Sequence, residues 1–233
     1  MESVRFQSPE KRSFSLVLHK MKVTAVVPVY NEEKTVGNVL KTLTSSDKID
    51  QVIVINGGST DSTLEIIKKF KVKIINLRYP NGKGDAVRIG TKNIKCEILL
   101  FFDADLIGLK KEHIDKLLEP VVNEGAAMVI GLRDKNNIIG NMVMPYFPLT
   151  GGERAMLTKV FMEIRKSPLI EGWGLESVMN DYCKKKKLKV VKIKLDGMDH
   201  IGLQTKKYGL MAFLKEIYDV ALTKIKLFGV KYD

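Results

Sequence analysis

The chain has 233 residues, of which 45% are hydrophobic and 28% are charged, and its formal net charge is +12 at pH 7. This composition predicts one ample hydrophobic core and excludes a disordered chain, and no apolar run approaches the roughly 20 residues that a membrane-spanning helix needs. The positive charge favours phosphorylated small molecules, anionic lipid or nucleic acid as partners.

Residues 1–21 show no clear hydrophobic period, and we interpret them as an N-terminal extension. Their apolar stretch is too short for the core of a signal peptide. Cys96 and Cys183 lie far apart without a CxxC spacing, which favours free thiols in a reducing compartment. We therefore expect a cytoplasmic protein.

From residue 22 to residue 131, apolar runs alternate with amphipathic stretches. Strands are expected at 23–30, 51–56, 72–77, 97–103 and 126–131. Helices are expected between them, at 32–43, 61–70, 84–93 and 111–122. This alternation predicts an α/β fold with a mostly parallel sheet covered by helices on both faces.

The second half, residues 132–205, is less regular. Residues 147–156 are expected to form a turn that leads into a helix, 171–185 a glycine-rich turn followed by a helix, and 188–195 a strand. Residues 206–233 are expected to form an amphipathic helical tail. We expect the tail to dock on the core or on the second copy of a homodimer, and contact with a membrane surface is the alternative.

The densest group of lysines, Cys183–Lys189, follows a predicted helix. A solvated helix end explains it, because cations are favourable at the C-terminus of a helix. An anionic membrane or acceptor surface is the alternative. Nucleic acid is not expected as a partner, because no aromatic residues alternate with these lysines.

Polar segments follow four of the expected strands, at 28–33, 56–61, 80–85 and 103–105. In open parallel sheets, ligands bind beyond the carboxyl ends of the strands. The four segments should therefore meet at one edge of the sheet, which is the predicted binding site.

Asp103 and Asp105 end a strand that reads as buried, and two carboxylates at this spacing can reach one hard cation. Mg²⁺ and Mn²⁺ prefer oxygen ligands and often bind substrate phosphates as well. Alone, such a pair is more often a turn or helix-cap feature. Lys83, in the glycine-rich segment Asn81–Ala86, adds a cation at a helix start, where exposed N–H groups favour anions.

The four segments together resemble glycosyltransferase family 2, whose members have the Rossmann-like GT-A fold and use nucleotide sugars. The residues that carry the resemblance are VVPVYNEE, VIVINGGSTDST, GKGDAVRIG and LLFFDADL, in this order. The resemblance implies a nucleotide-sugar site built from the matching positions. These positions are Pro28, Tyr30, Asn31, Glu32, Asn56, Gly58, Lys83, Asp103 and Ala104. Asn56 stands where family members usually carry an acidic residue, which leaves the base open between UDP- and GDP-sugars.

The acceptor half, with TGGERAM, GWGLE and a later histidine, resembles the glucosyl-3-phosphoglycerate synthase group. The resemblance implies an acceptor-side turn at Gly151, Gly152, Glu153 and Arg154. It also implies a Mg²⁺ or Mn²⁺ site formed by Asp105 and His200. Glu176 is expected to face the acceptor or the sugar, so Asp105 and Glu176 are the predicted catalytic residues.

The predicted function is metal-dependent glycosyl transfer from a nucleotide sugar to an acceptor such as 3-phosphoglycerate. The first alternative acceptor is a polyprenyl phosphate at the inner face of the membrane. A non-catalytic nucleotide-sugar-binding protein is the alternative from another class. A nucleotidyltransferase is disfavoured, because no glycine run follows the first strand.

Overall fold

The structure is a computed structural model that describes residues 18, 21–78, 82–133, 152–172, 174–200, 218, 221–223 and 225–232, and only the backbone of His200. Gly151, most of the predicted N-terminal extension and much of the predicted tail lie outside them.

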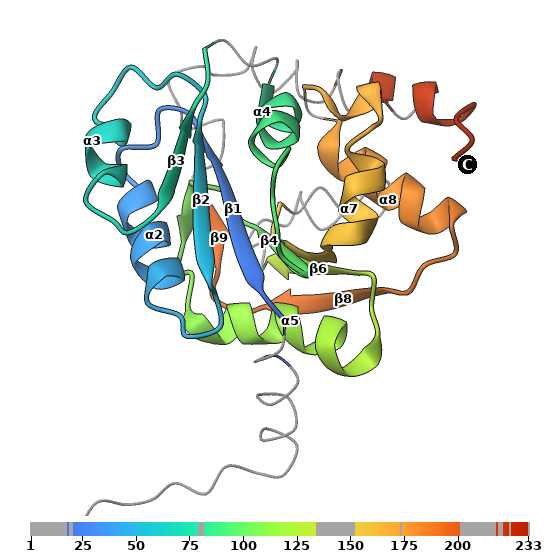
Figure 1. Cartoon of the computed structure of the whole chain (residues 1–233), viewed down its shortest axis with the longest axis horizontal. Helices are drawn as coiled ribbons and strands as arrows, with labels where there is room; N and C mark the ends of the chain where they lie inside the picture. The colour runs from blue at the N-terminus through green and yellow to red at the C-terminus, as the bar shows by residue number, and fades with distance from the viewer. Residues whose placement is uncertain are drawn as a thin grey trace, which may run out of the picture.

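A seven-stranded sheet forms the centre of the described part of the chain (Figure 1). Its strands are β1 (Val23–Val29), β2 (Gln51–Asn56), β3 (Lys73–Asn76), β4 (Ile98–Phe101), β6 (Met128–Arg133), β7 (Arg154–Leu157) and β8 (Val190–Leu195). Their order is β3-β2-β1-β4-β7-β6-β8. All neighbours are parallel except β7, which runs antiparallel to β4 and β6. The predicted mostly parallel sheet is confirmed.

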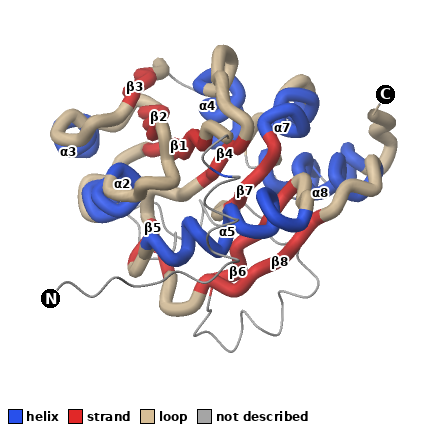
Figure 2. Tube along the Cα trace, turned by 60° about the horizontal axis from the view of Figure 1, so that its bottom comes forward, coloured by secondary structure: helices blue, strands red, loops and turns tan. Residues whose placement is uncertain are grey.

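Helices cover both faces of the sheet, as Figures 1 and 2 show. One face carries α2 (Val36–Thr44), α3 (Thr63–Ile67) and α5 (Lys111–Glu124). The other face carries α4 (Gly82–Gly90), α7 (Thr158–Ile164) and α8 (Leu175–Lys185), with the short 3₁₀ helix η1 (Pro168–Ile170). The helices thus form two layers around one sheet.

The side chains of β1 point alternately to the two faces of the sheet, so this strand contributes to both hydrophobic cores. Ala25 and Val27 belong to the core beneath α2 and α5, whereas Val26 belongs to the core beneath α4 and α7. All three side chains are fully buried. Successive residues of a strand point to opposite faces, so a strand buried on both sides must be apolar at nearly every position.

The expectation for residues 147–156 was wrong at its C-terminal end. Arg154–Leu157 is not part of a turn but forms β7, between β4 and β6. Its residues, RAML, all favour helices, and the helix α7 begins only at Thr158. Pairing on both sides with buried strands outweighs this local preference.

The turn before α2 also differs from the expectation. A helix was expected from residue 32, but α2 begins at Val36. Glu32 lies in a turn instead, where its carbonyl accepts hydrogen bonds from the N–H groups of Thr35 and Val36 at 3.1 and 3.0 Å. The polar segment after β1 is therefore a loop, as a binding edge requires.

The last described residues pack against α8. Leu227 is buried, and Tyr232 donates a hydrogen bond to Asp181 at 3.0 Å. Lys185 donates to the carbonyl oxygens of Leu227 and Val230 at 2.7 and 2.8 Å. This part of the predicted tail docks on the core, beside the helix that carries Glu176 (Figure 1).

Candidate active site

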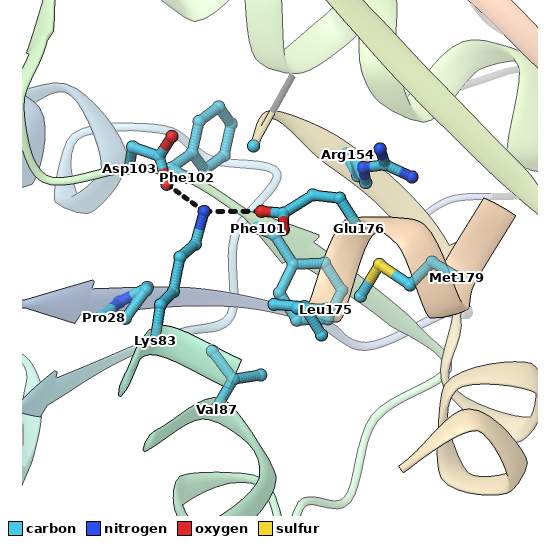
Figure 3. A pocket seen from close by; sticks show the side chains of 11 residues that line it. Pro28, Lys83, Val87, Phe101, Phe102, Asp103, Arg154, Leu175, Glu176 and Met179 are labelled. Atoms are coloured by element: carbon cyan, nitrogen blue, oxygen red, sulfur yellow. Dashed lines mark hydrogen bonds and ion pairs between the residues drawn. The ribbon is translucent and has the colours of Figure 1, made fainter. Parts of the chain in front are cut away.

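Lys83 lies between two carboxylates at the carboxyl edge of the sheet (Figure 3). Its ammonium nitrogen is 2.5 Å from Asp103 Oδ1 and 2.7 Å from Glu176 Oε1. Lys83 comes from the first turn of α4, Asp103 follows β4, and Glu176 lies in the first turn of α8. The fold thus brings together three of the predicted site residues, one of them 93 positions from Lys83.

These three side chains are largely shielded from water. Their exposed fractions are 17% for Lys83, 22% for Asp103 and 10% for Glu176. Burial opposes the charge of Lys83, but the two carboxylates outweigh it and raise its pKa above the usual value. Lys83 therefore stays positively charged, and it lies between two carboxylates that would otherwise repel each other.

The pocket around this ion pair is small. Its free volume is about 10 Å³, and its lining includes Pro28, Phe101 and Met179 besides the ion pair. That volume admits about one water molecule. A ligand that reaches Asp103 or Glu176 must therefore displace the ammonium group of Lys83 or bind to it.

Two glycines allow the close approach of the loops that build the pocket. A Cβ atom at Gly84 would overlap the carbonyl oxygen of Ile170, and the Gly84 N–H donates to Gly172 O at 3.0 Å. A Cβ atom at Gly152 would overlap the carboxylate of Asp103. Only glycine at position 84 lets the first turn of α4 approach Ile170 so closely, and only glycine at position 152 leaves room for the Asp103 carboxylate.

The loops after β1 and β2 are joined by hydrogen bonds. Asn31 has a left-handed backbone with φ of 55°, and its Oδ1 accepts from the N–H of Thr60 at 2.8 Å. The N–H of Asn31 donates to Ser59 Oγ at 3.0 Å. The N–H of Glu32 donates to Thr63 Oγ1 at 2.8 Å. The predicted nucleotide loops thus form one unit.

Asn56, at the end of β2, has a structural role that its sequence position did not reveal. Its side chain is buried, its Nδ2 donates to Asn76 Oδ1, and its Oδ1 accepts from the N–H of Ser59, both at 3.0 Å. Gly58 follows with φ of 86°. The predicted role of Asn56 in nucleotide binding stays a prediction, as does that of Gly58. The side chain of Tyr30, another predicted nucleotide-binding residue, is 51% exposed to solvent.

The backbone brings Asp105 and His200 together. Leu106, the residue after Asp105, pairs with His200 in a small antiparallel sheet of β5 (Leu106–Ile107) and β9 (Asp199–His200). Partners in such a sheet lie about 5 Å apart. Among side chains that the structure describes, no three metal-binding groups meet, and the side chain of His200 is not among them. The predicted metal site stays a prediction.

Asp105 is one of four carboxylates whose charges act on Arg133. Burial opposes the charge of Arg133, but surrounding carboxylates raise its pKa. These are Glu153, Asp103, Asp105 and Asp199. The positive charge of Arg133 is therefore offset by nearby carboxylates.

Arg133 forms a buried ion pair that no sequence pattern predicted. Its Nε lies 3.2 Å from Glu153 Oε2, with side-chain exposures of 11% and 0%. Apart from this ion pair, Arg133 Nη1 and the two carboxylate oxygens of Glu153 have no hydrogen-bond partner among the described residues. Burial, partly offset by Arg133, raises the pKa of Glu153 to about 7. The sequence signal was an arginine at the carboxyl end of a buried strand.

Arg154, predicted to contact the acceptor, lies deeper than expected. Only 1% of it is exposed. Its Nη1 donates to Asn180 Oδ1 at 2.7 Å and to Met128 Sδ at 3.4 Å. Since Arg154 also lines the pocket beside Glu176, its predicted contact with the acceptor stays a prediction. Gly152 lines the pocket, Glu153 next to it is fully buried, and Gly151 is outside the described residues.

The structure is that of an α/β protein with a small charged pocket beyond the carboxyl ends of its parallel strands. Residues 24–160, more than half of the chain, match the description "Glycosyl transferase family 2". The chain therefore belongs to glycosyl transferase family 2. No helix in the described part of the chain is long and apolar enough to cross a membrane.

Curated relatives include uncharacterized protein MJ1222 of Methanocaldococcus jannaschii, 36% identical over 52% of this chain and 51% of that protein. The UDP-N-acetylglucosamine–dolichyl-phosphate N-acetylglucosaminyltransferase of Methanococcus voltae is 29% identical over 48% of this chain and 51% of that protein. The matched part thus spans about half the length of these two relatives. Glycosyltransferase AglJ of Haloferax volcanii is 28% identical over 88% of this chain and 74% of that protein.

The fold also matches a solved structure over nearly its whole length. The glucosyl-3-phosphoglycerate synthase of Mycobacterium tuberculosis, crystallised with Mn²⁺, UDP and glucosyl-3-phosphoglycerate, superimposes with a TM-score of 0.79. The match covers 99% of this chain and 88% of that chain at 19% identity. At this identity, the similarity establishes the GT-A fold alone.

Proposed function

We propose that this protein transfers a sugar from a nucleoside-diphosphate sugar to an acceptor that carries a phosphate group. The observation that carries the proposal is the position of Lys83 between Asp103 and Glu176. A cation at the carboxyl edge of a parallel sheet suits a diphosphate, and the helix start that carries Lys83 adds N–H donors.

In the proposed reaction, the acceptor oxygen forms a bond to the anomeric carbon of the sugar. The bond from that carbon to the diphosphate breaks, and the nucleoside diphosphate leaves with the electron pair. Lys83 holds the negative charge that the leaving group gains, which stabilises the transition state. The proton of the acceptor hydroxyl must pass to a base.

In this proposal, Glu176 faces the sugar and the acceptor. In the structure its Oε1 accepts a hydrogen bond from Lys83. When the diphosphate binds the ammonium of Lys83, this carboxylate becomes available to the acceptor proton or to a hydroxyl group of the sugar. The stereochemical outcome distinguishes these two roles.

A divalent cation is part of the proposal. Asp105 and His200 would hold Mg²⁺ or Mn²⁺, which as a Lewis acid would neutralise the diphosphate. The carboxylates of Asp103 and Asp199 lie in the same charged region. The crystals of the Mycobacterium tuberculosis synthase contain Mn²⁺ or Mg²⁺.

Arg133 and Glu153 suit the phosphate of the acceptor. Arg133 Nη1 is buried without a hydrogen-bond partner among the described residues. A guanidinium group binds phosphate with two parallel hydrogen bonds. A phosphate at Arg133 would compete with Glu153, which can take up a proton near neutral pH because its pKa is about 7.

Two acceptors agree with this chemistry. A small phosphorylated acid such as 3-phosphoglycerate agrees with the fold match to the synthase. A polyprenyl phosphate agrees with the names of the Methanococcus voltae enzyme and of the dolichyl-phosphate β-glucosyltransferase of Trichomonas vaginalis. Both acceptors carry a phosphate group that Arg133 would bind.

The test has two stages. Thermal unfolding is measured with UDP-, GDP-, ADP- and dTDP-sugars, each with Mn²⁺ and with EDTA, because a ligand of the folded state raises the Tm. The donor that binds is then incubated with 3-phosphoglycerate or polyprenyl phosphate, and the released nucleotide is measured. A shift that EDTA removes, followed by transfer, supports the proposal. A donor that binds without transfer or hydrolysis would indicate a non-catalytic binding protein, and no binding would refute the proposal.

A further inference from the structure

A cationic and apolar surface lies where the last residues of the chain pack against the end of α8. We call it the α8–tail face. It consists of the exposed residues Lys184, Lys186, Lys187, Ile225, Lys226, Phe228 and Lys231. In Figures 1 and 2 it lies on the side of the molecule opposite to α2 and α3.

The fold joins these two groups of residues, which are about forty positions apart. Lys185 donates hydrogen bonds to the carbonyl oxygens of Leu227 and Val230. The rings of Tyr182 and Tyr232 meet at 4.9 Å between centroids. The lysines at the end of α8 and the apolar residues of the tail are therefore parts of one surface.

Two apolar side chains of this face are unusually open to solvent. Phe228 is 95% exposed and Ile225 is 73% exposed, whereas Leu227 between them is buried against the core. Leu227 accounts for the docking of this segment, but burial in the core does not explain why Phe228 and Ile225 are apolar. Exposed apolar residues that gather at one place mark contact sites.

The charge of the face selects the kind of partner. Five lysines carry positive charge, and Asp181, the acid on the last turns of α8, is held by Lys185 and Tyr232. A second copy of the chain would bring the same lysines into contact, and its net charge is also +12. An anionic surface that also accepts apolar side chains meets both requirements, and a bilayer with anionic lipids is such a surface.

We propose that the α8–tail face binds the protein to an anionic phospholipid bilayer, with Phe228 and Ile225 inserted among the acyl chains. The lysines bind the phosphate groups around them. The inference does not rest on the proposed function, since vesicle binding needs neither donor nor turnover. Glu176 lies in the first turn of α8 and this face at its end, so the 11-residue helix, about 16 Å long, links the site to the bilayer.

The test is co-sedimentation of the full chain with vesicles of phosphatidylcholine, alone or mixed with phosphatidylglycerol, at low and at high salt. Binding is expected only to the mixed vesicles and should weaken with salt. The triple variant Lys184→Gln, Lys226→Gln, Lys231→Gln should bind roughly 100-fold more weakly, because each lysine contributes about five-fold. Phe228→Ser should bind about ten-fold more weakly.

The matched control is Lys41→Gln, Lys68→Gln, Lys69→Gln, which removes the same charge from exposed positions of the α2–α3 side. This control should bind like the wild type. Equal weakening of both triple variants, or equal binding to vesicles without anionic lipid, would overturn the proposal. Dimerisation in light scattering that depends on Phe228, without vesicle binding, would assign the face to a second copy. Retention of RNA that depends on the same lysines, without vesicle binding, would assign it to nucleic acid.

Discussion

The ammonium of Lys83 lies 2.7 Å from the carboxylate of Glu176 and 2.5 Å from that of Asp103. The three side chains come from α4, α8 and the end of β4, so this contact joins both halves of the fold at the proposed donor site. A cation in this place serves two purposes. It holds the two carboxylates together in the structure, and in the proposed function it binds the diphosphate of the donor.

Replacing Lys83 tests both purposes. Lys83→Met leaves two largely buried carboxylates without their cation, which should lower the free energy of unfolding by about 3 kcal/mol at neutral pH. The loss should shrink in acid, because protonation removes the repulsion. Urea unfolding at neutral and acidic pH measures this effect.

The same variant should lose donor binding in the thermal-shift experiment, whereas Lys83→Arg, which keeps the charge, should retain part of it. Undiminished donor binding by Lys83→Met would show that Lys83 has only a structural role.

Replacing Asp105 tests the metal site. Asp105→Asn should lower transfer by about 10³-fold, since the cation supplies several kcal/mol of transition-state stabilisation. Its unfolding in the absence of metal should stay close to that of the wild type, because Asp105 is only partly buried at the edge of the sheet.

The control is Asp115→Asn on α5, which removes a carboxylate that pairs with Lys48 at 2.6 Å. It should leave transfer unchanged. Wild-type turnover by Asp105→Asn, or transfer that persists in EDTA, would contradict the metal assignment.

The buried carboxyl group of Glu153 should make the stability of the protein depend on pH. Burial raises its pKa from 4.5 in the unfolded chain to about 7 in the fold. Between these values the folded state binds more protons than the unfolded state, so the stability falls as the pH rises through this window and is level above it. Glu153→Gln should remove this part of the pH dependence.

Urea unfolding of both proteins at several pH values between 4 and 8 measures the difference in slope. Parallel profiles of the wild type and Glu153→Gln would show that Glu153 does not titrate in this window. Arg133→Gln should raise the Glu153 pKa further, because the arginine favours the charged carboxylate.

Replacing Gly152 tests how tightly the loop at this residue packs against Asp103. Gly152→Ala places a methyl group on the carboxylate of Asp103, so the variant should lose about 1–3 kcal/mol of stability and much of its transfer activity. Gly37→Ala in α2 is the control, since its methyl group would meet only Ile66 at 3.4 Å. That variant should gain up to about 1 kcal/mol. Full activity in Gly152→Ala would show that the loop adapts without moving Asp103.

The sequence by itself determined the layered fold and the edge at which the site lies. Val23–Val29 and Ile98–Phe101 are apolar at nearly every position, which only a strand buried on both faces requires. Polar residues directly after such strands must lie at one edge of a parallel sheet. Lys83 and Asp103 were predicted on these grounds, Glu176 was predicted only from the resemblance to the family, and the three side chains meet in the structure.

Only the tertiary structure decided which of these polar groups bind one another. The strand β7 arises from pairing with β4 and β6, against the helical preference of its own residues. Its position brings Glu153 beside Arg133, a contact between residues 20 positions apart that no local pattern encodes. Likewise, only the structure shows that the side chain of Asn56 forms hydrogen bonds with Asn76 and Ser59. Local patterns report whether a side chain is buried, whereas its partner depends on the path of the whole chain.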